Sequence, residues 1–374
     1  MNTITYKLGE ICKIVYGKGL PTKNLKPKGF PVFGANGIIG YYDSFLYEEE
    51  QVLISCRGAY SGKINISPKQ CFITNNSLVI TPKEENKVNK KYLYYTLQAT
   101  NKTKLVTGTA QPQVTINNAE DLQIPLPPLP TQHAIVSRIE TLFAELDKAV
   151  QHLRTAQQQL KTYRQAVLNH WLNNDEGKWE MVKLGEVVDV RDGTHDTPKY
   201  VQSGIPFVTQ KNITEFGISF SNVQYITEEE HLKFYERSNV AKNDILIAMI
   251  GANRGNATIV DTDAVFSIKN VGLIKYKPDT FNNKFLLFYL RSQGAKNYIK
   301  GQSKGGAQEF IGLKELRNFP VLCPPLAKQQ RIVKEIESRL SQASAAEASI
   351  ENALQQAEAL RQSILKKAFS GELV

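Results

Sequence analysis

Residues 127–140 read PPLPTQHAIVSRIE, and residues 324–337 read PPLAKQQRIVKEIE. The two stretches share the Pro-Pro-Leu start, a glutamine (Gln132 and Gln329) and the same Ile-Val and Ile-Glu pairs, at an offset of 329 − 132 = 197 residues. The offset still holds further along, where Arg164-Gln165 matches Arg361-Gln362. Such an internal repeat indicates that the chain contains two copies of one unit.

The repeat continues upstream, but with insertions. KLGE at residues 7–10 recurs at residues 183–186, an offset of 183 − 7 = 176, and the glycine-rich segments 54–62 and 247–255 correspond at an offset of 247 − 54 = 193. The first part of each copy has therefore diverged, whereas the last part has kept its length. We expect two divergent domains on two copies of one frame.

The constant part of each copy predicts a long helix. Residues 131–172 and 328–370 contain no Gly or Pro and are rich in Gln, Ala, Leu, Glu and Lys. Apolar residues recur every seven positions and predict a helical seam: Ile139, Leu146, Leu153, Leu160 and Val167 in the first copy, and Ile336, Ala343, Ile350, Ala357 and Ile364 in the second. The two seams would bury each other most simply in an antiparallel coiled coil roughly 60 Å long.

The divergent parts have a different character. Short β-like runs at residues 52–55, 77–80, 245–248 and 271–274 alternate with Gly, Asn and Pro clusters, and each part has one aromatic, helical stretch, at 91–97 and 284–290. We expect an α+β protein with an internal pseudo-two-fold repeat. Its order is a mixed α/β domain (1–130), a long helix (131–172), a linker (173–181), a second mixed domain (182–327) and a second long helix (328–370) with a tail to 374.

A proline-rich strap, at residues 124–130 and 319–326, leads into each long helix. Because the strap recurs at the same place in both copies, a structural role is favoured over the alternative, a PxxP ligand for a peptide-binding module.

Composition favours a polyanionic partner. The 46 Lys and Arg residues exceed the 36 Asp and Glu residues by 10, which points to nucleic acid, although a basic surface can also serve solubility alone. The chain shows neither a signal peptide nor an apolar run long enough to cross a membrane, so a cytoplasmic protein is expected. The scattered cysteines and histidines lack the spacing of metal ligands, so no metal site is expected.

The chain resembles the specificity subunit of type I restriction-modification systems, because it contains twice the order of variable domain, Pro-Pro-Leu strap and long helix. The phrases PVFGANGIIGY (31–41) and SILKKAFSGEL (363–373) add to the likeness, whereas the first helix lacks the Lys-Lys-Ala-Phe end of the second. The resemblance implies a target-recognition domain in each copy, a bipartite target in double-stranded DNA, and binding of two modification (methyltransferase) subunits, with restriction and translocase subunits joining through the complex. S-adenosylmethionine, ATP and Mg²⁺ would then act on those partner subunits, and this subunit would need no cofactor.

The sequence itself carries no motif for catalysis. The two Pro-Pro pairs precede leucine, unlike the Asn/Asp-Pro-Pro-aromatic loop of amino-methyltransferases, and no GxxxxGK[ST] loop is present. We therefore expect a non-catalytic subunit. A coiled-coil adaptor that binds only proteins is the main alternative, and a fused restriction-modification enzyme is opposed by the missing motifs.

Polar and basic residues in glycine-rich loops are the candidates for contact with DNA, since the backbone can approach a phosphate there and side chains can reach base edges. The alternative for each is a solvated turn. The candidates are Lys18, Thr22, Lys23, Asn36, Arg57, Tyr60, Ser61, Lys63, Thr109, Gln111 and Gln113 in the first domain, and Arg191, His195, Gln210, Lys211, Asn253, Arg254, Lys304 and Gln308 in the second.

Overall fold

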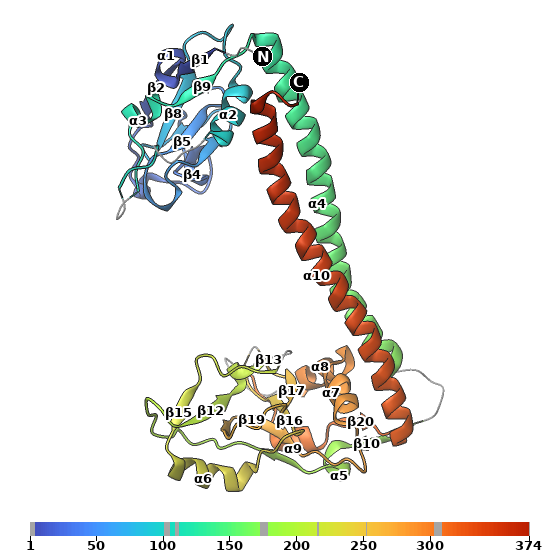
Figure 1. Ribbon diagram of the computed structural model, residues 1–374. Helices are drawn as coiled ribbons and strands as arrows, with labels where there is room; N and C mark the ends of the chain where they lie inside the picture. The colour runs from blue at the N-terminus through green and yellow to red at the C-terminus, as the bar shows by residue number, and fades with distance from the viewer. Residues whose placement is uncertain are drawn as a thin grey trace. The chain divides into compact units, whose positions relative to one another are not determined.

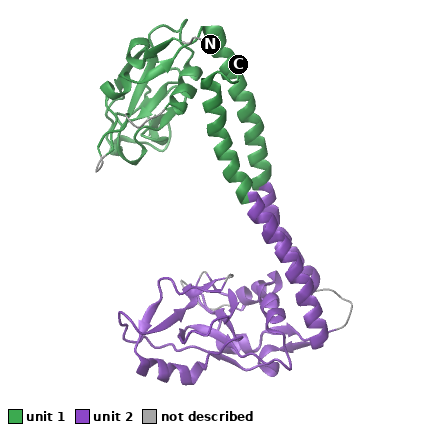
Figure 2. Ribbon diagram, in the orientation of Figure 1, with its two compact units in different colours: residues 1–154, 351–374 green, residues 155–350 purple. Residues whose placement is uncertain are grey.

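The computed structural model describes residues 4–100, 105–108, 112–172, 179–214, 217–251, 253–302 and 309–373. The chain divides into two compact units (Figure 2). Unit 1 comprises residues 1–154 and 351–374, and unit 2 comprises residues 155–350. Each unit holds one mixed α/β domain and a segment of both long helices, as the repeat predicts.

The first domain is built around two small sheets, and its first and last strands, β1 and β9, form a separate antiparallel pair. A four-stranded antiparallel sheet has the order β2-β8-β5-β6, and a three-stranded sheet has the order β4-β3-β7, in which β3 and β7 are parallel. Its elements are β1 (Thr5–Lys7), α1 (Leu8–Ile11), β2 (Cys12–Tyr16), η1 (Thr22–Asn24), β3 (Phe30–Phe33), β4 (Ile38–Tyr42), β5 (Val52–Ser55), η2 (Gly58–Tyr60), β6 (Ile64–Ile66), β7 (Phe72–Ile73), β8 (Ser77–Pro82), α2 (Lys90–Ala99), α3 (Ile116–Glu120) and β9 (Gln123–Pro125).

The second domain repeats these sheets strand for strand. The orders are β11-β19-β16-β17 and β15-β12-β18, again with one parallel pair, β12 with β18. Its elements are β10 (Met181–Lys183), α5 (Leu184–Val187), β11 (Val190–Asp192), β12 (Ile205–Thr209), η3 (Gln210–Asn212), β13 (Ile213–Thr214), β14 (Gly217–Ile218), β15 (Gln224–Ile226), α6 (Glu228–Ser238), β16 (Ile245–Ala248), β17 (Ala257–Ile259), β18 (Ser267–Lys269), β19 (Val271–Ile274), α7 (Asn283–Arg291), α8 (Gln293–Gly301), α9 (Leu313–Arg317) and β20 (Pro320–Leu322).

The strand and helix predictions for the two domains are confirmed. The runs 52–55, 245–248 and 271–274 are β5, β16 and β19, and the run 77–80 lies in β8. The aromatic stretches form α2 and α7, each begun by an asparagine cap, Asn89 or Asn282, whose side chain accepts a hydrogen bond from the first turn. Helices α6 and α8 and the β13–β14 pair have no counterpart among the described elements of the first domain, which accounts for part of the change in offset.

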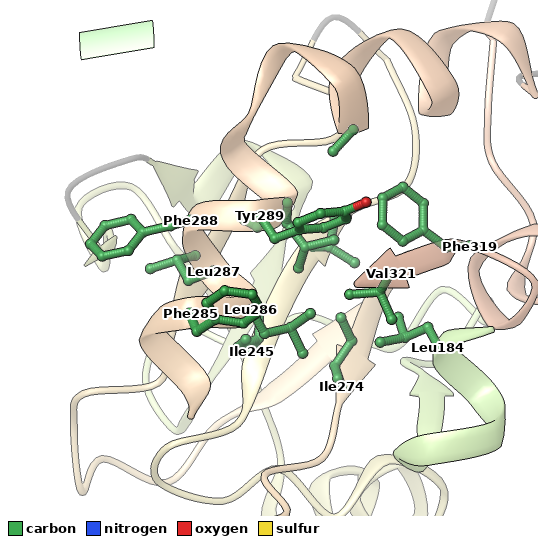
Figure 3. Packing of buried hydrophobic residues seen from close by; sticks show 14 of the residues in the cluster. Leu184, Ile245, Ile274, Phe285, Leu286, Leu287, Phe288, Tyr289, Phe319 and Val321 are labelled. Atoms are coloured by element: carbon green, nitrogen blue, oxygen red, sulfur yellow. The ribbon is translucent and has the colours of Figure 1, made fainter. Parts of the chain in front are cut away.

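Helix α7 joins the sheet of the second domain to the long helices. Its residues Phe285 to Leu290 are all buried, and they pack in one cluster with sheet residues such as Ile245 and Ile274 (Figure 3). Residues 167, 168 and 172 of the first long helix and 332, 333 and 336 of the second belong to the same cluster. The domain and its helix segments therefore share one core.

The two long helices are α4 (Leu129–Leu172) and α10 (Leu326–Ser370) (Figure 1). In unit 1, the start of α4 packs against the end of α10, for example Ile139 with Ile364 in one cluster. In unit 2, the end of α4 packs against the start of α10, with Val167 and Ile336 in one cluster. The helices are thus antiparallel in both units. Both begin two residues before the expected starts at 131 and 328. In α4 the earlier start places Pro130 in the first helical turn, where proline is tolerated.

The proposed seam residues differ in burial along the helices. Ile139 and Ile336 are fully buried, and Val167, Ala343 and Ile364 are buried as well. Leu146, Leu153, Leu160, Ile350 and Ala357 are half-buried.

A buried glutamine fastens each domain to its long helix. Gln132 Nε2 donates to the carbonyl oxygens of Lys87 and Pro127, both at 2.8 Å, and its Oε1 accepts from the backbone N–H of Asn89 at 2.9 Å. Both glutamines are fully buried. Because a buried amide must find partners, this side chain fixes the strap, the helix start and the cap of α2 in one place.

Gln329 makes the same set of contacts in the second copy. Its amide group donates to the carbonyl oxygens of Thr280 (3.1 Å) and Pro324 (2.8 Å) and accepts from the backbone N–H of Asn282 (2.8 Å). We refer to the two sets as the glutamine anchors. They give a physical reason for the recurrence of glutamine at this position of the repeat.

Candidate nucleic-acid interface

In the first domain, the segments that follow β3, β5 and β7 meet at one end of the two sheets. Ser77 Oγ donates to the carbonyl oxygen of Gly34 at 2.8 Å, and Ser55 Oγ donates to that of Ala35. The backbone N–H of Cys56 donates to the carbonyl oxygen of Asn76 at 2.9 Å. These bonds hold three loops together, and we call this part of each domain its loop end.

Most of the proposed contacts of the first domain lie at this loop end. Asn36 lies in the turn between β3 and β4, and the backbone N–H of Lys18 donates to Ile73 at the end of β7 (2.9 Å). Arg57 pairs through its backbone with Gln113. Ser61, Lys63 and Tyr60 belong to the same β5–β6 loop, where the Tyr60 side chain is exposed.

Two candidates of the first domain lie elsewhere in the chain, and two fall outside the description. Thr22 and Lys23 are exposed in η1, which lies between β2 and β3. Thr109 and Gln111 lie outside the described residues.

The β16–β17 loop of the second domain has the backbone of the β5–β6 loop. The N–H of Gly58 donates to the carbonyl oxygen of Pro112, and the N–H of Gly251 donates to that of Glu309, both at 3.2 Å. Gly58 and Gly251 have φ values of 77° and 74°, in the region that favours glycine. The recurrence of these glycines therefore reflects one shared loop geometry.

The side chains that this shared backbone presents are different. Position 61 is serine, whose Oγ donates to the Pro112 carbonyl oxygen at 2.6 Å. The corresponding position 254 is arginine, which contacts the Glu309 carbonyl oxygen at 3.2 Å and its carboxylate at 2.5 Å, and whose side chain is only 11% exposed. Arg254 thus fastens the loop as Ser61 does, and the tip of the second loop presents the exposed Asn253 where the first presents Tyr60.

His195 lies at the loop end of the second domain within a polar network. Its Nε2 is 3.0 Å from the carboxylate of Asp192, and its Nδ1 is 2.7 Å from Asn270 Oδ1. Asp192 is buried and also binds Arg237 at 2.6 Å. Sequence reasoning missed Asp192, Asn270 and Arg237, because they are separated by up to 78 residues (270 − 192) and form no local motif.

The remaining candidates of the second domain are divided. Gln210 and Lys211 lie in η3, directly after β12 and beside the end of β18. Arg191 does not lie in a loop: it is on β11, and its guanidinium pairs with Asp189 at 2.7 Å. Lys304 and Gln308 lie outside the described residues.

Between residues 4 and 373, less the undescribed gaps, no three His, Cys, Asp or Glu side chains are grouped so that they could hold a metal ion. In the same ranges, no helix has the length and apolar character needed to cross a membrane.

Comparison with known proteins agrees with the duplicated architecture. The family model described as type I restriction modification DNA specificity domain matches the chain twice, at residues 2–153 and 176–356. The type I restriction enzyme EcoBI specificity subunit of Escherichia coli is 28% identical over 321 residues, which cover 78% of this chain and 67% of that subunit.

Two solved structures share the fold over nearly the whole chain. One comes from work on complex assembly and conformational transition of the type I R-M system; it has a TM-score of 0.74 at 20% identity and covers 100% of this chain and 99% of that one. The HsdS subunit from Thermoanaerobacter tengcongensis has a TM-score of 0.58 at 21% identity, and the match covers 99% of this chain and 97% of that subunit.

Proposed function

Because this chain belongs to the family of type I restriction-modification DNA specificity domains, we propose that it reads a bipartite DNA sequence, one half-site with each domain. As a specificity subunit, it determines the DNA target of its system. The finer assignment is that the loop end of each domain contacts bases, and that the two half-sites are different sequences separated by base pairs that neither domain reads.

One observation carries this proposal. Two domains of the same sheet order have loops of the same backbone, but the exposed side chain at the tip differs: it is Tyr60 in one loop and Asn253 in the other. A common frame with exchanged side chains is what two readers of different sequences require, because base identity is read through the donors and acceptors of side chains.

We assign methyl transfer and cleavage to partner subunits. The sequence of this chain contains neither an amino-methyltransferase loop nor a nucleotide-triphosphate loop. Two modification subunits would bind along the duplicated helices, one for each copy of the repeat, and restriction subunits would join through them. S-adenosylmethionine, ATP and Mg²⁺ would be bound by those partners.

Mapping of N6-methyladenine in a host genome tests the proposal. A host that carries this gene and its modification partner should methylate one interrupted, non-palindromic motif, and deletion of this gene alone should abolish the methylation. Methylation of a continuous motif that depends on this gene would contradict the two-reader proposal.

The adaptor alternative makes a different prediction. A protein that only binds other proteins should show no salt-dependent affinity for DNA. A DNA reader that neutralises phosphates should bind DNA with an affinity that falls steeply as the salt concentration rises. Affinity of the assembled complex for target DNA, measured across a range of salt concentrations, separates the two.

A further inference from the structure

A cavity of about 490 Å³ lies in unit 2. Its walls come from α4, α10, the β16–β17 hairpin, and helices α7 and α8, which lie beside α10 (Figure 1). The volume is within the range of cavities that hold small ligands. Four basic residues line it, opposed by a single carboxylate: Lys161, Arg164, Arg291 and Lys296 against Glu347.

The carboxylate in this cavity is already neutralised. Arg164 Nη2 binds the Glu347 carboxylate at 2.8 Å and Ser344 Oγ at 3.1 Å. Lys161 and Lys296 have no ion-pair partner within the part of the chain that the structure describes. The cavity therefore offers positive charge to an anion from outside the chain.

Two neutral polar groups also line the cavity, the carbonyl group of Ala257 and the side-chain amide of Gln165. The carbonyl oxygen of Ala257 accepts from Arg291 Nε at 3.1 Å and from its Nη2 at 2.9 Å, which fixes the position of that guanidinium. Gln165 has a buried amide oxygen without a hydrogen-bond partner among the described residues. A buried polar atom of this kind is normally satisfied, by water or by a ligand that donates to it.

Unit 1, which is related to unit 2 by the repeat, provides an internal comparison. At the positions equivalent to Lys161 and Ser344 it has acids, Glu358 and Asp147, each 197 residues away, and at the position equivalent to Arg291 it has Gln98, 193 residues away. Arg361, the equivalent of Arg164, contacts Asp147 and lies over the ring of Phe143 at 4.3 Å. The cationic lining is thus a property of unit 2 and does not follow from the frame that the two units share.

We propose that this cavity is a phosphate-binding site. Lys161, Lys296 and Arg291 would hold the phosphate oxygens, because arginine and lysine form strong charge-assisted hydrogen bonds with them. Gln165 would accept a hydrogen bond from an amino or hydroxyl group of the same ligand.

The phosphate has two possible sources, the DNA backbone and a free nucleotide. The DNA source rests on the proposed function and makes the site a sequence-independent contact beside the second domain. Such a contact positions a reader on the duplex without specifying a base.

A charge-neutral double variant tests the site in the full chain assembled with its modification partner. Lys161→Gln with Lys296→Gln removes two cavity cations, and Lys233→Gln with Lys314→Gln, two exposed lysines of the same unit outside the cavity, is the matched control. Affinity for the target duplex and for an unrelated duplex is measured as a function of salt, and inorganic pyrophosphate is titrated by calorimetry.

If a DNA phosphate binds in the cavity, the cavity variant should lose the same affinity for both duplexes. The slope of its log affinity against log salt concentration should also become shallower by about 1, and the control variant should show smaller changes in both quantities. A free nucleotide predicts an unchanged slope and a loss of pyrophosphate binding that the control retains. An unchanged salt slope together with unchanged pyrophosphate binding would overturn the proposal. A variant that loses only its binding to the modification subunit would also overturn it, because the cavity would then hold an acidic side chain of that subunit. Absence of salt-dependent DNA binding in the unmodified complex would count against the proposed function, while the pyrophosphate titration would still test the site.

Discussion

Arg164 donates a hydrogen bond to Ser344 at 3.1 Å. In the repeat, Arg361 is the equivalent of Arg164 and Asp147 is the equivalent of Ser344, each at an offset of 197 residues, and these two residues also contact each other. Both contacts join α4 to α10, one in unit 2 and the other in unit 1. The two units therefore pair their helices in the same register, although one contact is between an arginine and a hydroxyl and the other is an ion pair.

This relationship predicts unequal effects of two substitutions in unit 1. Asp147→Ala removes only the partly exposed ion pair, worth about 0–1 kcal/mol. Arg361→Ala also removes the stacking of its guanidinium on Phe143, which adds about 0.5–1 kcal/mol. Chemical denaturation should show the larger loss in unfolding free energy for Arg361→Ala. Equal losses would mean that the stacking contributes nothing.

The glutamine anchors predict a larger effect from a single buried amide. Gln132→Ala should reduce the unfolding free energy by about 1–3 kcal/mol, because the N–H of Asn89 and two carbonyl oxygens lose a buried partner. Gln132→Glu should cost more, since its carboxylate would face those carbonyl oxygens. Thermal and chemical unfolding measure both.

Gln330→Ala, at the exposed neighbour of the second anchor, is the control and should leave stability nearly unchanged. A Gln132→Ala protein as stable as the control variant would show that the anchor does not hold the domain to its helix.

The anchors also show what a sequence can and cannot predict. The repeat, the long helices and the strands such as β5 and β16 follow from local pattern, because hydrophobic periodicity determines which residues face a core. The recurrence of Gln132 at position 329 marks it as important, but its role depends on carbonyl groups of Lys87 and Pro127, one of them 45 residues away, whose directions only the folded chain determines.

In the candidate interface, too, the sequence predicts some features and not others. Gly58 and Gly251 recur because both loops need a positive φ, which a repeat in the sequence can reveal. Arg57 and Arg254 look alike in the sequence, and the structure separates them: Arg57 is exposed, whereas Arg254 is bound to Glu309. That distinction depends on a residue 55 positions further along the chain, outside any local motif.

The difference between these two arginines can be measured in binding. Arg57→Ala should weaken binding to target DNA by about 1–3 kcal/mol and relax one base position if its guanidinium pairs with a guanine. Arg254→Ala should act mainly on the stability of its loop, and Arg254→Ser should restore stability, because serine fills this place in the first domain. Affinity for a set of single-base target variants, together with melting temperature, tests both.

Equal weakening on every duplex would make Arg57 a phosphate contact, and no weakening would make its loop a solvated turn. A base-specific loss for Arg254→Ser at unchanged stability would contradict the fastening role.

His231 predicts a dependence of stability on pH. It is buried in α6 with its Nδ1 2.8 Å from Ser267 Oγ, and desolvation lowers its pKa below the ordinary value of 6.5, although the charge of Glu228 acts in the opposite direction. Below pH 6.5 the unfolded chain therefore takes up a proton more readily than the folded chain, so stability present above that pH is lost as the pH falls.

Replacement of His231 by glutamine should reduce this loss between pH 7 and 5, measured by chemical denaturation, relative to replacement of the exposed His152. Identical pH profiles for the two variants would contradict the prediction.

The duplication itself is tested most directly by a fragment of residues 1–178, which contains one domain, its strap and α4. Its helix lacks α10, which covers Ile139 and Val167 in the full chain, so two fragments should pair antiparallel and dimerise. Since Asp147 occupies the position equivalent to Ser344, Arg164 of one fragment should meet Asp147 of the partner subunit.

Selection of DNA by this fragment together with the modification partner is the deciding measurement. The account predicts an interrupted palindrome built from the half-site of the first domain, because a two-fold axis relates two identical readers. A dimer should be seen by sedimentation, and Arg164→Asp should weaken it. A monomeric fragment that still selects DNA, or a selected motif without two-fold symmetry, would contradict the claim that this chain is two copies of one reader and helix.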